Sequence, residues 1–145
     1  MTVADYVPIA DVQSACRELG LSDWSRLTSP EISLEEAKKV QEVIGAEASL
    51  ISTEQFRAGL EVELEHGLQF SDANVTNNHP LLTGKIVLAH LKEMLDYYQR
   101  LEVAELEGDM LKARRAGNEQ KLAKLYARLL VARRELAESE AAALT

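Results

Sequence analysis

The sequence predicts an all-α fold of about five helices, in which a small N-terminal helical body precedes a long C-terminal antiparallel helical hairpin. Three observations carry this prediction. Ala, Leu and Glu abound while aromatic residues make up only 5% of the chain, and this composition favours helices over strands. Apolar residues recur at helical spacing, without sustained strand-type alternation outside one polar loop. Only three prolines and seven glycines interrupt the 145 residues.

The first predicted helix runs from about Ile9 to Leu19. Pro8 precedes it, and Gly20 follows as a stop signal. The next segment reads as a short capped turn that carries Trp24, which we expect to anchor in the core.

The second and third helices have clear start signals. Ser33 and Glu36 have the spacing of a capping box, and Gly45 ends the apolar stripe that follows. Thr53 is the expected N-cap of the third helix, which we expect to end at Gly67.

A polar loop over residues 68–79 separates these helices from the rest of the chain. Pro80 suits the first turn of a fourth helix, which meets no strong breaker before Gly108 and is expected to continue to Ala116. A fifth helix from Glu119 to about residue 140 would complete the hairpin. We therefore expect one domain, with N-terminal helices over residues 1–67, the loop over 68–79 and the hairpin over 80–145. The apolar stripe of so long a hairpin needs covering, which predicts a homodimer through the hairpin.

Composition limits the functional classes. A net charge of −8 argues against nucleic acid as a partner, because phosphate contacts need a basic surface. No apolar run reaches the 18 residues typical of a membrane span, so no membrane partner is expected. Cys16 is the single cysteine, lies in an apolar-periodic segment and is expected in the core. Its lack of a disulfide partner fits a cytoplasmic protein.

Two helical phrases point to chemistry, because each carries a carboxylate and an imidazole three residues apart. They are Glu63 with His66, and His90 with Glu93. On a helix this spacing puts the two side chains on one face, with about 5–6 Å between their Cβ atoms. Two such helices packed together could offer four ligands to iron, manganese or zinc. A metal with an open position would support redox or hydrolytic chemistry.

Glu65 and Tyr97 extend this candidate metal site as further ligands or as hydrogen-bonding neighbours. The same pairs also have a reading without metal, as ion pairs that satisfy each other inside the protein. In that alternative the chain is a non-enzymatic helical interaction or dimerisation module, and the buried His–Glu pairs are structural locks.

About half of the chain resembles an uncharacterised family of small bacterial and viral domains of unknown function. The matching phrases are Glu35–Lys38, Phe56–Gly67, Asn74–Asn77, Thr83–Glu93 and Asp96–Tyr98. The sequence departs from the family pattern at Met94-Leu95, where Phe-Pro is expected. Without that proline, the fourth helix should be straight and the hairpin longer.

A weaker resemblance is to ferritin-like carboxylate proteins, whose di-iron sites use Glu-x-x-His on inward-facing helices. The Glu63–His66 phrase has that order, and the His90–Glu93 phrase reverses it. The resemblance implies two further bridging glutamates, for which Glu102 or Glu105 of a dimer partner are candidates.

Overall fold

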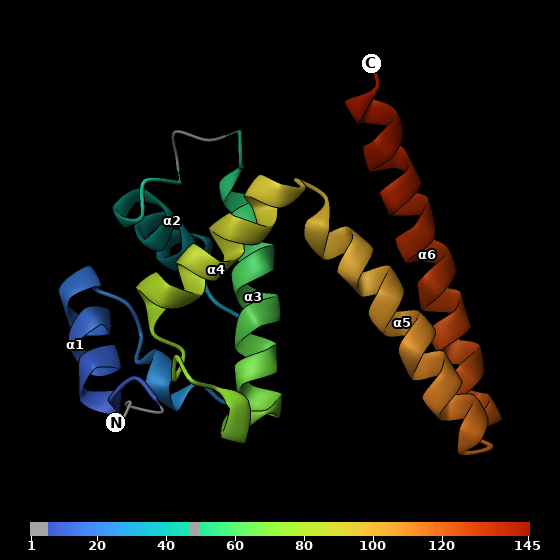
Figure 1. Ribbon diagram of the computed structural model, residues 1–145, viewed down its shortest axis with the longest axis horizontal. Helices are drawn as coiled ribbons and strands as arrows, with labels where there is room; N and C mark the ends of the chain where they lie inside the picture. The colour runs from blue at the N-terminus through green and yellow to red at the C-terminus, as the bar shows by residue number, and fades with distance from the viewer. Residues whose placement is uncertain (1–5, 47–49) are drawn as a thin grey trace, which may run out of the picture. The chain divides into compact units, whose positions relative to one another are not determined.

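A computed structural model describes residues 6–46 and 50–145, which form helices and turns and contain no strand (Figure 1). The all-α prediction is therefore confirmed for this part of the chain. It holds six α-helices rather than about five, in two compact units, Met1–Leu95 and Asp96–Thr145. The helices and 3-10 turns are, in order, α1 (Ile9–Leu19), η1 (Trp24–Arg26), α2 (Leu34–Val43), α3 (Thr53–Gln69), η3 (Ser71–Ala73), α4 (Pro80–Glu93), α5 (Tyr97–Arg115) and α6 (Glu119–Ala143).

The first two helices begin and end where local signals predict. α1 ends at Gly20, which adopts the left-handed conformation with φ 63°. Ser33 and Glu36 form both hydrogen bonds of a capping box at the start of α2. Trp24 is fully buried, so its predicted role as a core anchor is confirmed.

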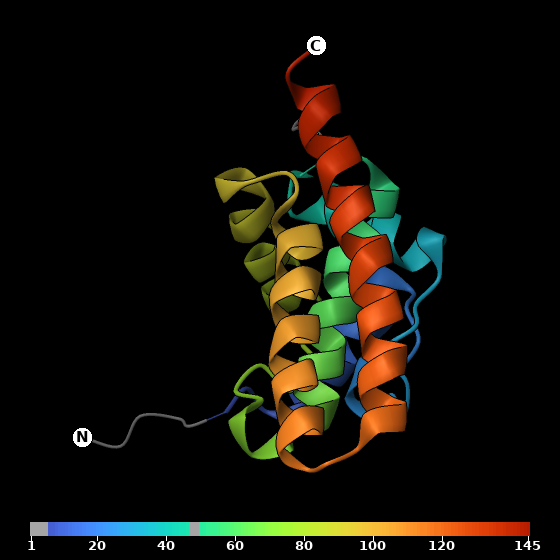
Figure 2. The same ribbon diagram turned by 90° about the vertical axis from the view of Figure 1, so that its right-hand side faces the viewer.

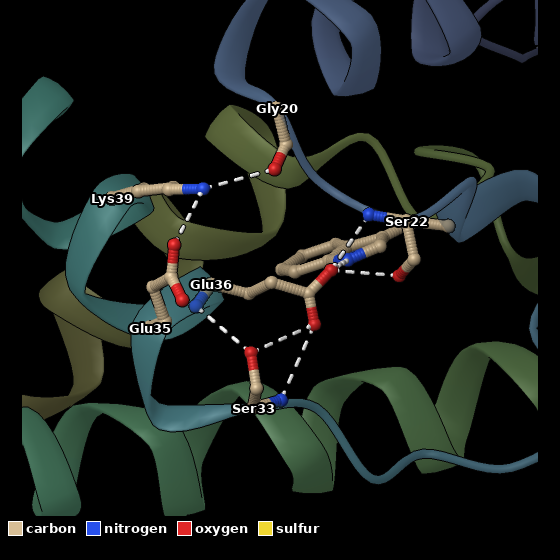
Figure 3. A network of polar contacts seen from close by, with 7 residues as sticks. Gly20, Ser22, Ser33, Glu35, Glu36 and Lys39 are labelled. Carbon is tan, nitrogen blue, oxygen red and sulfur yellow. Dashed lines mark hydrogen bonds and ion pairs between the residues drawn. The ribbon is translucent and has the colours of Figure 1, made fainter.

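One carboxylate ties the start of α2 to the segment that follows α1 (Figure 3). The backbone N–H and the hydroxyl of Ser22 donate to Glu36 Oε1 over 2.8 and 2.7 Å, and Trp24 Nε1 donates to the same oxygen over 3.4 Å. The Ser33 N–H donates to Glu36 Oε2 over 3.2 Å. Burial raises the pKa of the Glu36 carboxyl, but these hydrogen bonds outweigh it and hold the pKa below its ordinary value.

The third helix differs from its predicted bounds at both ends. Its N-cap is Ser52, which forms a capping box with Gln55, and Thr53 is the first helical residue. The helix also continues past Gly67 to Gln69. Gly67 therefore does not end the helix. Its lack of a side chain instead lets the loop after α3 approach the helix. A Cβ at Gly67 would collide with Asn78 Oδ1 and would lie 2.7 Å from Asn74 Nδ2.

α4 starts at Pro80 as predicted and packs closely on α2. A Cβ at Gly84 would lie 2.7 Å from Val40 Cγ1. Val40, Phe56 and Val87 are fully buried around this contact. The absence of a side chain at Gly84 thus allows the helices to approach each other.

The predicted long fourth helix is wrong, because the chain breaks after Glu93. Met94 is extended, with φ −150° and ψ 130°, and a new helix begins at Tyr97. Just before this new helix, both oxygens of Asp96 accept hydrogen bonds from Arg100, over 3.0 and 2.7 Å. A carboxylate at a helix N-terminus interacts favourably with the helix dipole, and the bidentate pair holds it there. The missing proline at residue 95 therefore does not produce a continuous helix.

The second unit consists of α5 and α6, which lie side by side in both views (Figures 1 and 2). Gly117 turns the chain with φ 66°, and Asn118 caps α6 by accepting a hydrogen bond from the Lys121 N–H over 2.9 Å. This helix stop and N-cap are as predicted. The buried core between the helices comprises Leu106, Ala113, Leu125, Leu129 and Ala132.

Candidate functional site

The structure brings both histidines of the predicted site to one carboxylate. Glu63 lies on α3, and its side chain is 16% exposed. His90 of α4 places Nδ1 3.1 Å from Glu63 Oε1, within hydrogen-bond distance. His66, one turn further along α3, places Nδ1 4.0 Å from Glu63 Oε2. The helical spacing thus aligns the Glu63–His66 pair, and the packing of α3 on α4 adds His90.

The other predicted ligands lie elsewhere on their helices. Glu65 on α3 and Glu93 in the last turn of α4 are exposed. Tyr97 is not on α4, because it is the first residue of α5 in the second unit, where its ring meets Tyr98 edge-on at 5.1 Å. Within residues 6–46 and 50–145, no group of three or more His, Cys, Asp or Glu side chains is arranged to hold a metal ion.

A cavity of about 270 Å³ opens beside Glu63, between α3, α4 and the loop that joins them. Three large apolar side chains around it are exposed: Phe70 at 52%, Val75 at 56% and Ile86 at 38%. The full lining comprises Glu63, His66, Gly67, Phe70, Ala73, Asn74, Val75, Thr76, Thr83 and Ile86. Apolar walls with a few convergent polar groups are typical of a ligand site.

Side-chain hydrogen bonds hold the loop wall of this cavity in place. Asn74 Nδ2 donates to the Gly67 carbonyl over 3.3 Å and to Asn78 Oδ1 over 2.9 Å. The Thr76 hydroxyl donates to Asn74 Oδ1 over 3.1 Å. Asn77 and Asn78 adopt positive φ, a conformation that Asn tolerates better than most residues.

The same two asparagines connect this loop to the N-terminal part of the first unit. Asn77 Nδ2 donates to the Val7 carbonyl over 2.7 Å. Asn78 Nδ2 donates to the Trp24 carbonyl over 3.3 Å, and Asn78 is buried. The predicted polar loop is therefore an ordered wall. The loop residues that line the cavity were not identified from the sequence, although the run of Asn and Thr in this loop is typical of side chains that hydrogen-bond the backbone of a turn.

The site offers one carboxylate, imidazole nitrogens, hydroxyl and amide groups, and apolar walls in a single concavity. Such groups can accept and donate hydrogen bonds to a bound molecule and can exchange protons with it. In the described segments, no helix combines the length and apolar character needed to cross a membrane.

Comparison with curated proteins and with solved structures finds no match to this chain, so neither supports the ferritin-like resemblance. A family comparison does find a match, which covers residues 12–107. This range runs from α1 into α5 and includes Glu63, His66, His90 and the loop between them. The predicted resemblance to an uncharacterised domain family is therefore confirmed. The chain belongs to the family described as "Protein of unknown function (DUF5661)".

Proposed function

We propose that this protein is a helical self-association module, in which two copies pair through α5 and α6. Five large apolar side chains are exposed on this unit, including Val131 and Leu144, and the observation that carries the proposal is that three of the five share one face. Leu111, Tyr126 and Leu130 are 54%, 51% and 50% exposed. Clustered apolar side chains of this size mark interaction surfaces more often than isolated ones do.

Two ion pairs support the placement of these side chains on one face. Glu107 pairs with Arg133 at 2.9 Å, and Arg114 pairs with Glu119 at 2.8 Å. At 100° per residue, Leu111 lies on the same side of α5 as Glu107 and Arg114. Tyr126 and Leu130 lie on the same side of α6 as Glu119 and Arg133. The ion pairs also bracket the three residues along the chain. We call Leu111, Tyr126 and Leu130 the Tyr126 face.

Charge supports a second copy as the occupant of the Tyr126 face. Residues 96–145 hold 9 Asp+Glu and 9 Lys+Arg, so this unit has no net charge, whereas residues 1–95 hold 15 against 7, a balance of −8. Both signs flank the Tyr126 face, which suits a twofold interface in which the same patch meets itself. With α5 and α6 as the predicted antiparallel hairpin, two copies would form a four-helix bundle.

In this proposal the Glu63–His90 contact is a lock between α3 and α4 and performs no catalysis. A half-buried carboxylate that contacts imidazoles from its own helix and from the next one fits that role. We place the protein in the cytoplasm, because Cys16 is buried and is the single cysteine of the sequence.

The test compares two neighbouring substitutions on α6. Leu130→Lys puts a charge on the Tyr126 face, whereas Val131→Lys puts the same charge about 100° further around α6, outside that face, at a residue that is 45% exposed. Sedimentation velocity of the full-length protein should show dimers for the wild type and Val131→Lys and monomers for Leu130→Lys. Equal masses for the two variants, with unchanged helical content, would contradict the Tyr126 face as the interface.

A second candidate function is metal binding by a reduced set of the predicted ligands. It is supported by the approach of two imidazoles to the two oxygens of one carboxylate, at 3.1 and 4.0 Å. These three side chains are not arranged around one ion in the structure, so metal binding requires them to converge further. Two histidines and one carboxylate are a known ligand set for iron, and they also suit manganese or zinc. Elemental analysis of tag-free protein should then find near-stoichiometric metal that a His66→Ala, His90→Ala double variant lacks. The lock proposal instead expects no metal in either protein.

A further inference from the structure

The cavity beside Glu63 has a charge pattern that the self-association proposal does not use. Glu63 is the single formally charged residue among the ten that line it, when histidine is counted as neutral. A second cavity of about 180 Å³, on the other side of Gly67 and Asn74, is lined by apolar, Ser and Asn residues and has no formal charge. The first cavity is therefore the one with a built-in preference for a cation.

Its dimensions and walls favour a compact ligand with an apolar part. A cavity of roughly 150 Å³ lined by apolar side chains can hold one benzene molecule. At about 270 Å³, the cavity beside Glu63 has room for a ring and a short chain. Phe70, Val75 and Ile86 supply the apolar wall, and their large exposed fractions mean that a ligand would cover surface that now faces water.

Its polar groups match the donors of an ammonium ion. A primary ammonium has three N–H donors and no acceptor. Glu63, Thr76 and Thr83 line the cavity, and carboxylate and hydroxyl oxygens can accept hydrogen bonds. The Phe70 ring at the same cavity can add a cation–π contact. The charge of −8 on residues 1–95 also favours the approach of a cation over that of an anion.

We propose that this cavity binds a small primary ammonium compound with a compact apolar body, such as an arylalkylamine or a short alkylamine. The ammonium group lies against Glu63, and the apolar body lies against Val75 and Ile86. This site belongs to the unit Met1–Leu95, so the proposal does not depend on pairing through α5 and α6.

Three probes of matched shape test the proposal: 2-phenylethylamine, which is a cation at neutral pH, 2-phenylethanol, which is neutral, and phenylacetate, which is an anion. Binding to full-length protein is measured by NMR titration of backbone amides. We expect a millimolar dissociation constant for the amine, at least about tenfold weaker binding of the alcohol, and no binding of phenylacetate. The shifted amides should include those of Gly67, Asn74 and Thr76.

Two substitutions on α4 provide a matched pair, because Ile86 and Leu82 are both 38% exposed and lie one turn apart. Only Ile86 lines the cavity. Ile86→Lys places a competing ammonium at its wall and should abolish amine binding, whereas Leu82→Lys should leave the dissociation constant within about twofold. Both variants keep Glu63 and His90, the two residues of the α3–α4 contact.

Several results would overturn the proposal. Equal affinity for the amine and the alcohol would show that charge does not select the ligand. Amide shifts outside the cavity, or equal losses in Ile86→Lys and Leu82→Lys, would place binding elsewhere. Absence of binding by 2-phenylethylamine, cyclohexylmethylamine and butylamine alike, at concentrations well above millimolar, would also reject it. None of these results bears on self-association, which the mass of the wild-type protein in solution tests separately.

Discussion

Replacing Gly84 with Ala tests the packing of α4 on α2 with a single methyl group. The new Cβ would lie 2.7 Å from Val40 Cγ1, 3.3 Å from Ile44 Cδ1 and 3.4 Å from Phe56 Cζ. Val40 is fully buried and β-branched, so its methyl group has little freedom to move away. The substitution therefore forces either the side chain of Val40 or the helix itself to shift.

Two opposing effects set the magnitude. Ala is favoured over Gly inside a helix by about 1 kcal/mol, which would stabilise α4. Overpacking in a dense core costs about 1–3 kcal/mol. Because a 2.7 Å contact leaves no room for the methyl group, overpacking should win, and Gly84→Ala should lower the free energy of unfolding by about 1 kcal/mol.

The assay is urea unfolding followed by the fluorescence of Trp24, the single tryptophan, which reports on the first unit. With a urea dependence of about 2 kcal/mol per M, the midpoint should fall by about 0.5 M. Gly108→Ala is the control, because Gly108 lies inside α5 with nothing within 4 Å of a new Cβ. Helical circular dichroism should show that this control stabilises the second unit by about 0.5–1 kcal/mol.

A background variant identifies the cause. In Val40→Ala protein, which lacks the crowding methyl, Gly84→Ala should be neutral or stabilising. If Gly84→Ala raises the wild-type midpoint, or lowers it equally in both backgrounds, the contact with Val40 does not explain the glycine.

Glu36→Gln should lower the melting temperature at neutral pH, measured by thermal unfolding. The gap in melting temperature between variant and wild type should shrink as pH falls through the lowered pKa of Glu36, because the stability that a depressed carboxyl pKa provides is lost on protonation. A gap of the same size in acid would refute this. Cys16 is 2% exposed and burial raises its pKa, so iodoacetamide should label it only at the rate of unfolding, followed by mass spectrometry; rapid labelling of folded protein would refute its burial. Gly67→Ala should displace the side chains of Asn78 and Asn74 and cost about 1–3 kcal/mol in urea unfolding. A neutral effect would show that these side chains move away without cost.

Sequence reasoning succeeded where a few adjacent residues determine the structure. The capping box of Ser33 and Glu36 and the glycine stop at Gly20 lie within one helical turn of the ends that they define. The Gly117-Asn118 turn is equally local, since Asn118 bonds a backbone N–H three residues ahead. Such signals need no knowledge of the tertiary structure.

Sequence reasoning failed where a specific contact between side chains determines the structure. No Gly or Pro marks the end of α4 after Glu93. The start of α5 is instead defined by the contact between Asp96 and Arg100. An Asp and an Arg four residues apart are also compatible with a continuous helix, so the pattern was ambiguous. The prediction that the helix ends at Gly67 is wrong because the approach of Asn78 and Asn74 is visible only in the folded chain.

The candidate site shows the same division. Helical spacing was enough to place Glu63 beside His66 on α3. The choice between Glu63 and Glu93 as the partner of His90 depends on how α3 and α4 pack, and helical periodicity contains no information about that register. The cavity beside Glu63 depends additionally on a loop that is fixed by asparagine side chains.

The mass of the full-length protein in solution tests the central claim most directly. Sedimentation equilibrium over a wide range of concentration should give twice the chain mass of 16.1 kDa, with a return to the monomer mass in Leu130→Lys. A wild-type mass of 16.1 kDa at every concentration would contradict self-association through α5 and α6.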